Sequence, residues 1–250
     1  MLIVSALPVV ILISTLIITA VYRANRQIKP LSKENILFIT AHPDDECMFF
    51  SPAILGMQGS NLFLVCLSIG DAEGLGKVRS KELLASCNRL GIPPRNVFQI
   101  NSCMLPDSMS AEWDAREILG IVLPLLKSKR IDRIVTFDAY GVSGHANHRA
   151  IYQAIKSGVD QGNISIPVYV LISVSLLRKF TSVFDILFTD LTHRSDLTFV
   201  ASPHHYQVGR NAMFEHSSQL VWFRYLYLLF SRYMVINNLQ LVENRSGPRD

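Results

Sequence analysis

The sequence predicts an α/β fold, in which a Rossmann-like, mostly parallel sheet is flanked by helices and preceded by one N-terminal transmembrane helix. Short apolar runs alternate with helical stretches along the chain, which is the pattern of parallel βαβ units. Residues 2–22 contain no charged side chain and are long enough to span a bilayer. Two loops rich in His and Asp each follow an apolar run, at the end of the strand where such sheets bind ligands.

The expected strands are short apolar runs bounded by polar or turn residues. They cover residues 36–40, 62–68, 97–100, 132–137 and 168–174. Pro43 ends the first strand, because proline cannot donate a hydrogen bond within a central ladder. Gly70 closes the second.

Helices are expected between these strands. They cover residues 47–58, 77–90 and 111–129, and another helix begins near His145. Gly91-Ile-Pro-Pro94 ends the second helix, because glycine permits a left-handed cap and proline blocks continuation. Pro124 is expected to kink the third helix.

Composition excludes several classes of protein. Charged residues make up 18% of the 250 positions and apolar residues 49%, so the chain is not disordered. Only one stretch is apolar enough to span, which excludes a polytopic membrane protein. The net charge of +4 is compatible with an anionic membrane surface but is too small and scattered to predict nucleic-acid binding. The cysteines lack CxxC spacing and are expected to be free thiols.

As a helix, residues 2–22 would rise about 32 Å, enough for a hydrocarbon core of about 30 Å. Arg23, Arg26 and Lys29 follow at once, so the rest of the chain is expected in the cytoplasm. A cleaved signal peptide, with Ala20 near the cleavage site, is the alternative. It is less favoured because no basic residue precedes the apolar run, which is also longer than usual.

These features divide the chain into four parts. Residues 2–22 form the transmembrane anchor and residues 23–34 a linker. Residues 35–240 are expected to form the α/β domain, and residues 241–250 a polar tail.

The two polar loops carry side chains that suit a metal-dependent hydrolase. His42, Asp44 and Asp45 follow the first strand, and His145 and His148 follow the fourth. Imidazole and carboxylate bind zinc and similar divalent ions, and a catalytic site commonly uses three protein ligands. One His and one Asp from the first loop and one His from the second would supply them. The remaining Asp and His would be left as general base and electrostatic helper.

Two motifs carry a resemblance to a known family. Ala41-His-Pro-Asp-Asp-Glu46 and Gly144-His-Ala-Asn-His148 resemble the LmbE-like de-N-acetylase superfamily. The stretches Arg79–Leu84, Val135–Ala139 and Ser218–Arg224 are similar to its branch that acts on N-acetylglucosaminyl-phosphatidylinositol, in the second step of glycosylphosphatidylinositol (GPI) anchor synthesis. The resemblance covers residues 35–238, which is most of the chain.

The resemblance implies a role for each site residue. The metal ligands would be His42, Asp45 and His148, holding a divalent ion, with Zn²⁺ as the expected one. Asp44 would act as general base and then acid, and a protonated His145 would stabilise the oxyanion. His216 would position the substrate, the alternative being a plain surface histidine.

The implied reaction is hydrolysis of the N-acetyl group, which gives glucosaminyl-phosphatidylinositol and acetate. The implied setting is the endoplasmic reticulum membrane, with one span and the catalytic domain facing the cytoplasm. One alternative is deacetylation of another N-acetylglucosamine conjugate. Another is a non-catalytic membrane scaffold with a vestigial metal site, although a scaffold would not need both Asp44 and Asp45. A dinucleotide-binding domain is excluded because no GxGxxG follows the first strand.

Residues 222–234 are densely aromatic and include Arg224 and Arg232. Aromatic and basic residues together suit a membrane headgroup interface. A core helix or buried strand is the alternative. At 13 residues the segment is too short to span a bilayer as a helix.

Overall fold

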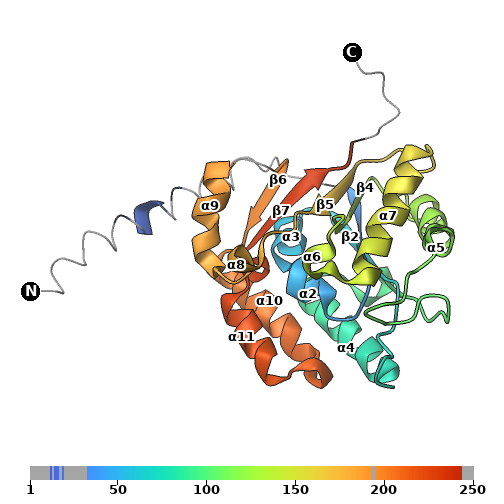
Figure 1. Ribbon diagram of the computed structural model, residues 1–250, viewed down its shortest axis with the longest axis horizontal. Coiled ribbons are helices and arrows are strands. Elements are labelled where there is room, and N and C mark those ends of the chain that lie inside the picture. The colour runs from blue at the N-terminus through green and yellow to red at the C-terminus, as the bar shows by residue number, and fades with distance from the viewer. Residues whose placement is uncertain (1–11, 13, 17–18, 20–32, 193–194, 244–250) are drawn as a thin grey trace, which may run out of the picture.

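The computed structural model describes residues 12, 14–16, 19, 33–192 and 195–243 (Figure 1). Most of the predicted anchor 2–22, almost all of the linker 23–34 and most of the tail 241–250 lie outside these residues. Within the described part, no helix has both the length and the hydropathy needed to cross a membrane.

A sheet of seven strands forms the centre of the domain, in the order β3-β2-β1-β4-β5-β7-β6. Strands β1 to β5 pair in parallel, as predicted, and β7 runs antiparallel to both β5 and β6. The strands are β1 (Asn35–Thr40), β2 (Asn61–Cys66), β3 (Val97–Gln99), β4 (Arg133–Phe137), β5 (Val168–Leu171), β6 (Leu197–Val200) and β7 (Ile236–Leu241).

The antiparallel strands β6 and β7 are absent from the sequence prediction. Strand β7 contains the polar residues Asn237 and Asn238, so it lacks the short apolar run from which the parallel strands were predicted. Both asparagines are buried, and hydrogen bonds satisfy them. Asn237 donates to the carbonyl of Phe49 and accepts from the backbone N–H of Ala53, so this strand ties the sheet to the first helical segment.

Helices cover both faces of the sheet. They are α2 (Asp45–Phe49), α3 (Ser51–Gly56), α4 (Gly76–Arg89), α5 (Ala115–Ser128), α6 (Gly141–Gly144), α7 (Ala146–Asp160), α8 (Leu176–Lys179), α9 (Asp185–Thr192), α10 (Pro203–Glu215) and α11 (Trp222–Phe230). Short 3-10 turns are η1 (Pro94–Asn96), η2 (Ser182–Phe184), η3 (Ser217–Gln219) and η4 (Arg232–Met234). Figure 1 shows α5 and α7 together on one side of the sheet, and α4 beside α10 on the other.

Two predicted helices differ from the observed ones. The single helix expected over residues 47–58 is divided at Phe50 into α2 and α3. The helix expected from residue 111 begins at Ala115, because the side chain of Asp114 accepts the backbone N–H of Arg116 and caps the helix there.

The order of the strands creates a crevice at the edge of the sheet where the metal site is expected. From β1 the chain proceeds outward to β2 and β3, and from β4 it proceeds outward to β5 on the other side. Strands β1 and β4 are neighbours, so the loops that follow them diverge at the carboxyl edge of the sheet. Ligands of α/β sheets bind at such a switch point.

The aromatic segment 222–234 divides into an exposed helix and a buried turn. Helix α11 exposes most of its aromatic and aliphatic side chains, whereas Arg232, Tyr233 and Met234 are buried. The guanidinium of Arg232 pairs with Asp185, at 2.6 Å from Nε to Oδ2. Arg232 is therefore not available to a membrane headgroup, which corrects that part of the sequence interpretation.

Candidate active site

The turn after β1 positions the first three polar residues. The carboxylate of Asp45 accepts the backbone N–H groups of Ala41 and His42, each at 2.9 Å, which closes the turn. Asp44 has a φ of 110°, in the left-handed region that non-glycine residues seldom occupy. Glu46 accepts the backbone N–H of Asp44 at 3.1 Å and so helps to hold this conformation. Strained backbone of this kind is concentrated at functional sites.

The loop after β4 positions the two histidines. His145 caps α7, where its Nδ1 accepts the backbone N–H of Asn147 at 3.2 Å. His148 lies within the first turn of α7, and its ring stacks on Phe137 with 4.0 Å between centroids. Gly141 has a φ of +66°, and a Cβ there would lie 2.6 Å from the Cβ of His148. The loop thus needs glycine at this position to bring His148 to the sheet edge.

The two loops meet at the crevice. The ring of His42 lies 4.7 Å from that of His145 and 5.5 Å from that of His148, between centroids. Nε2 of His148 is 3.2 Å from Oδ1 of Asp45, and Nδ1 of His42 is 3.9 Å from its Oδ2. The neighbouring carboxylate of Asp44 points elsewhere, toward Arg224 at 3.0 Å.

The protonation of the histidines fits a bound cation. Nδ1 of His148 lies 3.0 Å from the carbonyl oxygen of Gly141, so Nδ1 carries the proton. Its Nε2 is buried and faces Oδ1 of Asp45 at 3.2 Å, so Nε2 is the ring nitrogen that a cation beside Asp45 would contact. Nε2 of His42 lies 3.0 Å from Oδ1 of Asn147 and 3.1 Å from Asp107, both acceptors, so Nδ1 of His42 is the free atom. Metal-binding histidines are oriented in this way.

The pKa shifts of the carboxyl groups of Asp45 and Asp44 also fit a metal site with a separate base. Burial opposes ionisation of Asp45, but His148 and His42 outweigh burial and hold its pKa below the ordinary value. Asp45 is therefore an anion beside two imidazole rings, and the same attraction raises the pKa of His148. Two imidazoles and one carboxylate form a donor set that suits zinc and similar divalent ions, which would bind in place of the imidazole proton. For Asp44, burial outweighs the attraction of Arg224 and raises the pKa above its ordinary value, which is the direction of shift that suits a general base.

The structure corrects the expected charge of His145. Burial, together with the nearby His42 and His148, lowers the pKa of His145 to about 4. Its ring is therefore neutral at physiological pH rather than protonated. Because Nδ1 accepts the N–H of Asn147, the single proton is on Nε2. A neutral Nε2–H can still donate a hydrogen bond to a developing oxyanion.

Asp107 and Arg79 belong to the site and were missed from sequence as members of it, as was Arg224, which pairs with Asp44. Asp107 lies 3.1 Å from Nε2 of His42 and 3.1 Å from Nη1 of Arg79. Arg79 also donates to the carbonyl of Pro43 and thus braces the first loop. Asp107 lies in an irregular segment without a motif, so no sequence signal indicates it. Arg79 stands on the buried face of α4, four residues before Leu83, and it begins the stretch Arg79–Leu84 that carries the family resemblance, which was the signal that could have indicated it.

These residues line a cavity of about 400 Å³. All five predicted site residues of the two loops are on its wall, together with Arg79, Asp107 and Arg224. The volume is within the usual range for small-molecule sites, and the wall is largely polar.

His216 is neither a surface histidine nor a member of the cavity wall. It is fully buried, and its Nε2 lies 2.7 Å from Oε1 of Glu46. Burial opposes the charge of each partner, but their mutual attraction lowers the pKa of Glu46 and raises that of His216. Glu46 also accepts the backbone N–H of Asp44, so His216 stabilises the loop after β1 indirectly, through Glu46.

The ion pair of Glu46 and His216 predicts a pH range in which it stabilises the fold most. The contribution of Glu46 is present above its ordinary pKa of 4.5 and is lost as pH falls through its lowered folded value. The contribution of His216 is present below 6.5 and is lost as pH rises through its raised folded value. Between pH 5 and 6.5 we expect His216→Gln to lower the free energy of unfolding by about 3–5 kcal/mol, measured by urea denaturation.

The exposed pair of Arg89 and Glu215, 2.7 Å apart, supplies the control. Arg89→Gln should cost at most about 1 kcal/mol. A His216→Gln penalty that stays constant well above pH 7 would show that the charged pair is not its source.

Comparison with known proteins identifies the family. A profile described as GlcNAc-PI de-N-acetylase, where GlcNAc-PI is N-acetylglucosaminyl-phosphatidylinositol, matches residues 37–159. The N-acetylglucosaminyl-phosphatidylinositol de-N-acetylase of Bos taurus is 43% identical over 210 residues, which cover 82% of this chain and 83% of that protein. The chain belongs to the GlcNAc-PI de-N-acetylase family.

A second member of the GlcNAc-PI de-N-acetylase family supports this assignment over nearly its whole length. The probable enzyme of Dictyostelium discoideum is 35% identical, over 86% of this chain and 96% of its own. Among solved structures, the N,N'-diacetylchitobiose deacetylase of Pyrococcus horikoshii has a TM-score of 0.59 at 17% identity, covering 83% of both chains. The zinc-inhibited teicoplanin deacetylase Orf2 has a TM-score of 0.54 at 15% identity, covering 75% of this chain and 85% of its own. These two show that the fold is shared.

Proposed function

We propose that the chain removes the N-acetyl group from N-acetylglucosaminyl-phosphatidylinositol by hydrolysis, giving glucosaminyl-phosphatidylinositol and acetate. This is the second step of GPI-anchor synthesis. The observation that carries the proposal is the cluster of His42, Asp45 and His148, with Asp44 beside it, in a chain of the GlcNAc-PI de-N-acetylase family. The cluster supplies a metal site, and Asp44 supplies a separate base.

The three clustered residues would hold a divalent ion, and Zn²⁺ suits two imidazoles and one carboxylate. When bound, such an ion supplies an activated water molecule and polarises the carbonyl of the acetamide. Asp107 and the carbonyl of Gly141 orient the two histidines through Nε2 of His42 and Nδ1 of His148, which would leave the other nitrogen of each ring for the ion.

The protein's own residues carry the proton transfers. The carboxylate of Asp44 takes the proton of the attacking water, and its raised pKa suits it to keep that proton briefly. Nε2–H of His145 donates to the carbonyl oxygen as negative charge develops there. Asp44 then gives its proton to the nitrogen of the leaving amine, and acetate and the glucosaminyl product separate. Arg224 and Arg79 keep Asp44 in place between these two transfers.

The test is acetate release by the full-length protein in detergent micelles. The substrates are N-acetylglucosaminyl-phosphatidylinositol and a soluble N-acetylglucosamine conjugate without a lipid. We expect the lipid substrate to have the higher kcat/KM. Equal or better turnover of the soluble conjugate would favour the alternative substrate class, and no turnover of either would defeat the proposed activity.

We further propose that residues 2–22 anchor the protein in the endoplasmic reticulum membrane, with the catalytic domain in the cytoplasm. Support comes from the uncharged apolar run followed by Arg23, Arg26 and Lys29. The sequons at Asn163 and Asn244 test this orientation, because glycosylation occurs only in the lumen. We expect no endoglycosidase-sensitive mass on the protein from membranes, and a glycan at either site would place the domain in the lumen.

A further inference from the structure

A second cavity adjoins the catalytic one and has a different character. Its volume is about 500 Å³, and its wall is largely apolar. Met48, Phe49, Ser143 and Arg224 line both cavities, so the two share a boundary. The rest of the apolar wall comes from the segment around α8 and from α11.

One cation lies at this boundary, and a second lies on the apolar side of it. Lys179 lines the apolar cavity, and Arg224 lines both cavities. The polar cavity therefore meets the apolar cavity at Arg224, which also pairs with Asp44, and Lys179 adds a second cation on the apolar side. A phosphatidylinositol that carries a sugar has the same order of parts, because a sugar and inositol are joined through an anionic phosphodiester to glycerol and two acyl chains.

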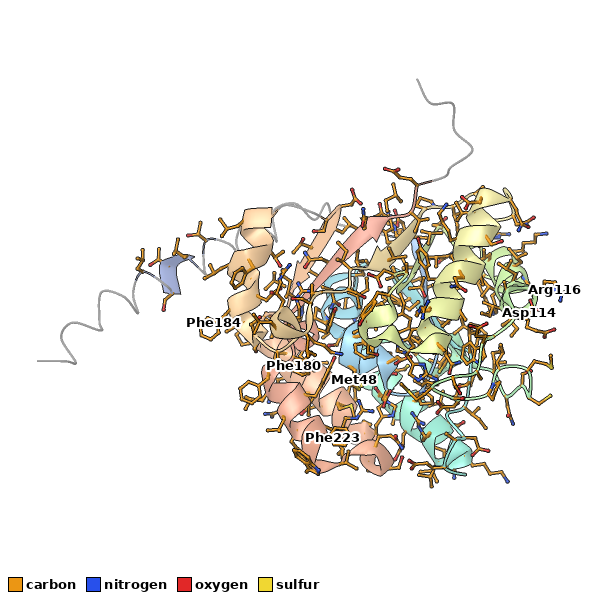
Figure 2. All side chains as sticks on the ribbon, viewed as in Figure 1. Met48, Asp114, Arg116, Phe180, Phe184 and Phe223 are labelled. Carbon is orange, nitrogen blue, oxygen red and sulfur yellow. The ribbon has the colours of Figure 1, made fainter. Side chains whose placement is uncertain are left out.

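The rim of the apolar cavity is exposed to a degree that is unusual for a soluble surface. Trp222 at the cavity is 74% exposed, and Leu177 on the adjacent α8 is 81% exposed. Figure 2 shows Phe180, Phe184 and Phe223 on one side of the molecule, opposite the charged side chains on α5 and its cap. Large exposed apolar patches mark interaction surfaces. Here the exposed apolar side chains include five that line the cavity, namely Phe180, Trp222, Phe223, Leu226 and Phe230.

We propose that the apolar cavity holds acyl chain of the lipid substrate, with the phosphodiester at Lys179 and Arg224 and the sugar in the catalytic cavity. This rests on the proposed function, because it assigns the lipid part of the same substrate. The exposed apolar rim then faces the bilayer, so a chain can pass from the membrane into the cavity without crossing water. Burial of acyl chain in the cavity adds affinity that a chain-free substrate cannot gain.

A pair of neighbouring residues on α11 gives a matched test in the full-length protein. Leu226 lines the cavity and is 47% exposed, whereas Tyr225 is 52% exposed and lines neither cavity. The substrates are dioctanoyl N-acetylglucosaminyl-phosphatidylinositol and its deacylated form. We expect Leu226→Ser to lower kcat/KM about tenfold on the dioctanoyl substrate and to leave the deacylated one unchanged. Tyr225→Ser should change neither.

A binding measurement separates the cavity from the chemistry. Phosphatidylinositol with brominated octanoyl chains, kept below its micelle concentration, should quench the fluorescence of Trp222 on the cavity wall. The quenching should disappear in Trp222→Phe and weaken in Leu226→Ser.

The outcomes distinguish this proposal from the proposed function. Equal losses on both substrates in Leu226→Ser, no loss on either, or the absence of quenching would overturn the lipid cavity while leaving deacetylation intact. If the wild type deacetylates neither substrate, the proposed function is wrong. The quenching experiment alone then decides whether the cavity binds acyl chain: quenching that Trp222→Phe abolishes supports the cavity, and its absence rejects it.

Discussion

Replacing Asp44 by asparagine should lower the turnover of the lipid substrate by about 10²–10⁴ while leaving the metal content unchanged. The amide keeps the shape of the carboxylate and can still accept from Arg224, now 3.0 Å from Oδ2, but it cannot take a proton from water. Asp44 lies outside the cluster of His42, Asp45 and His148, so the ion should remain bound. Acetate release and elemental analysis on the same preparation measure both quantities.

His145→Ala is the companion variant. Loss of one oxyanion donor typically costs about 10²–10³ in turnover, and His145 also lies outside the three-residue cluster. Both variants should therefore purify with metal. Turnover of Asp44→Asn within tenfold of the wild type would remove Asp44 from its role as base, and another group would have to accept the proton.

Replacing Asp45 or His148 by alanine should abolish both metal binding and acetate release. Each variant removes one of three protein ligands, and each also removes the partner of a buried group, since Nε2 of His148 faces Oδ1 of Asp45 at 3.2 Å. Elemental analysis after dialysis against a weak chelator should find a divalent ion in the wild type and almost none in these variants. Circular dichroism establishes that the variants remain folded.

Asp107→Asn is the matched control for ligand loss. Asp107 contacts His42 but is not among the three proposed ligands, and an outer partner of this kind typically contributes about 10–100-fold to affinity. We expect this variant to keep its metal without chelator and to lose it at lower chelator concentration than the wild type. Full metal occupancy in both Asp45→Ala and His148→Ala would contradict the ligand assignment.

The parallel part of the fold and the meeting of the two loops could be predicted because both depend on local pattern. Apolar runs with intervening helices predict parallel strands, and parallel strands bring their carboxyl ends to one edge of the sheet. The position of His42 after β1 and of His148 after β4 followed from that rule. The strand containing Asn237 and Asn238 did not follow, since its polar side chains can be buried there only with the help of partners far away in the sequence, such as Ala53 and Thr198.

By itself, the sequence determined which residue types stand at the ends of β1 and β4, and therefore the chemistry that the crevice can perform. Only the tertiary structure decided the protonation states of the histidines in and behind the site. His145 is neutral because burial and two other imidazoles oppose a further positive charge, and His216 is paired because the fold brings it 2.7 Å from Glu46, 170 positions away in the chain. Burial and long-range charge depend on which distant segments pack together, and no local pattern in the chain records that.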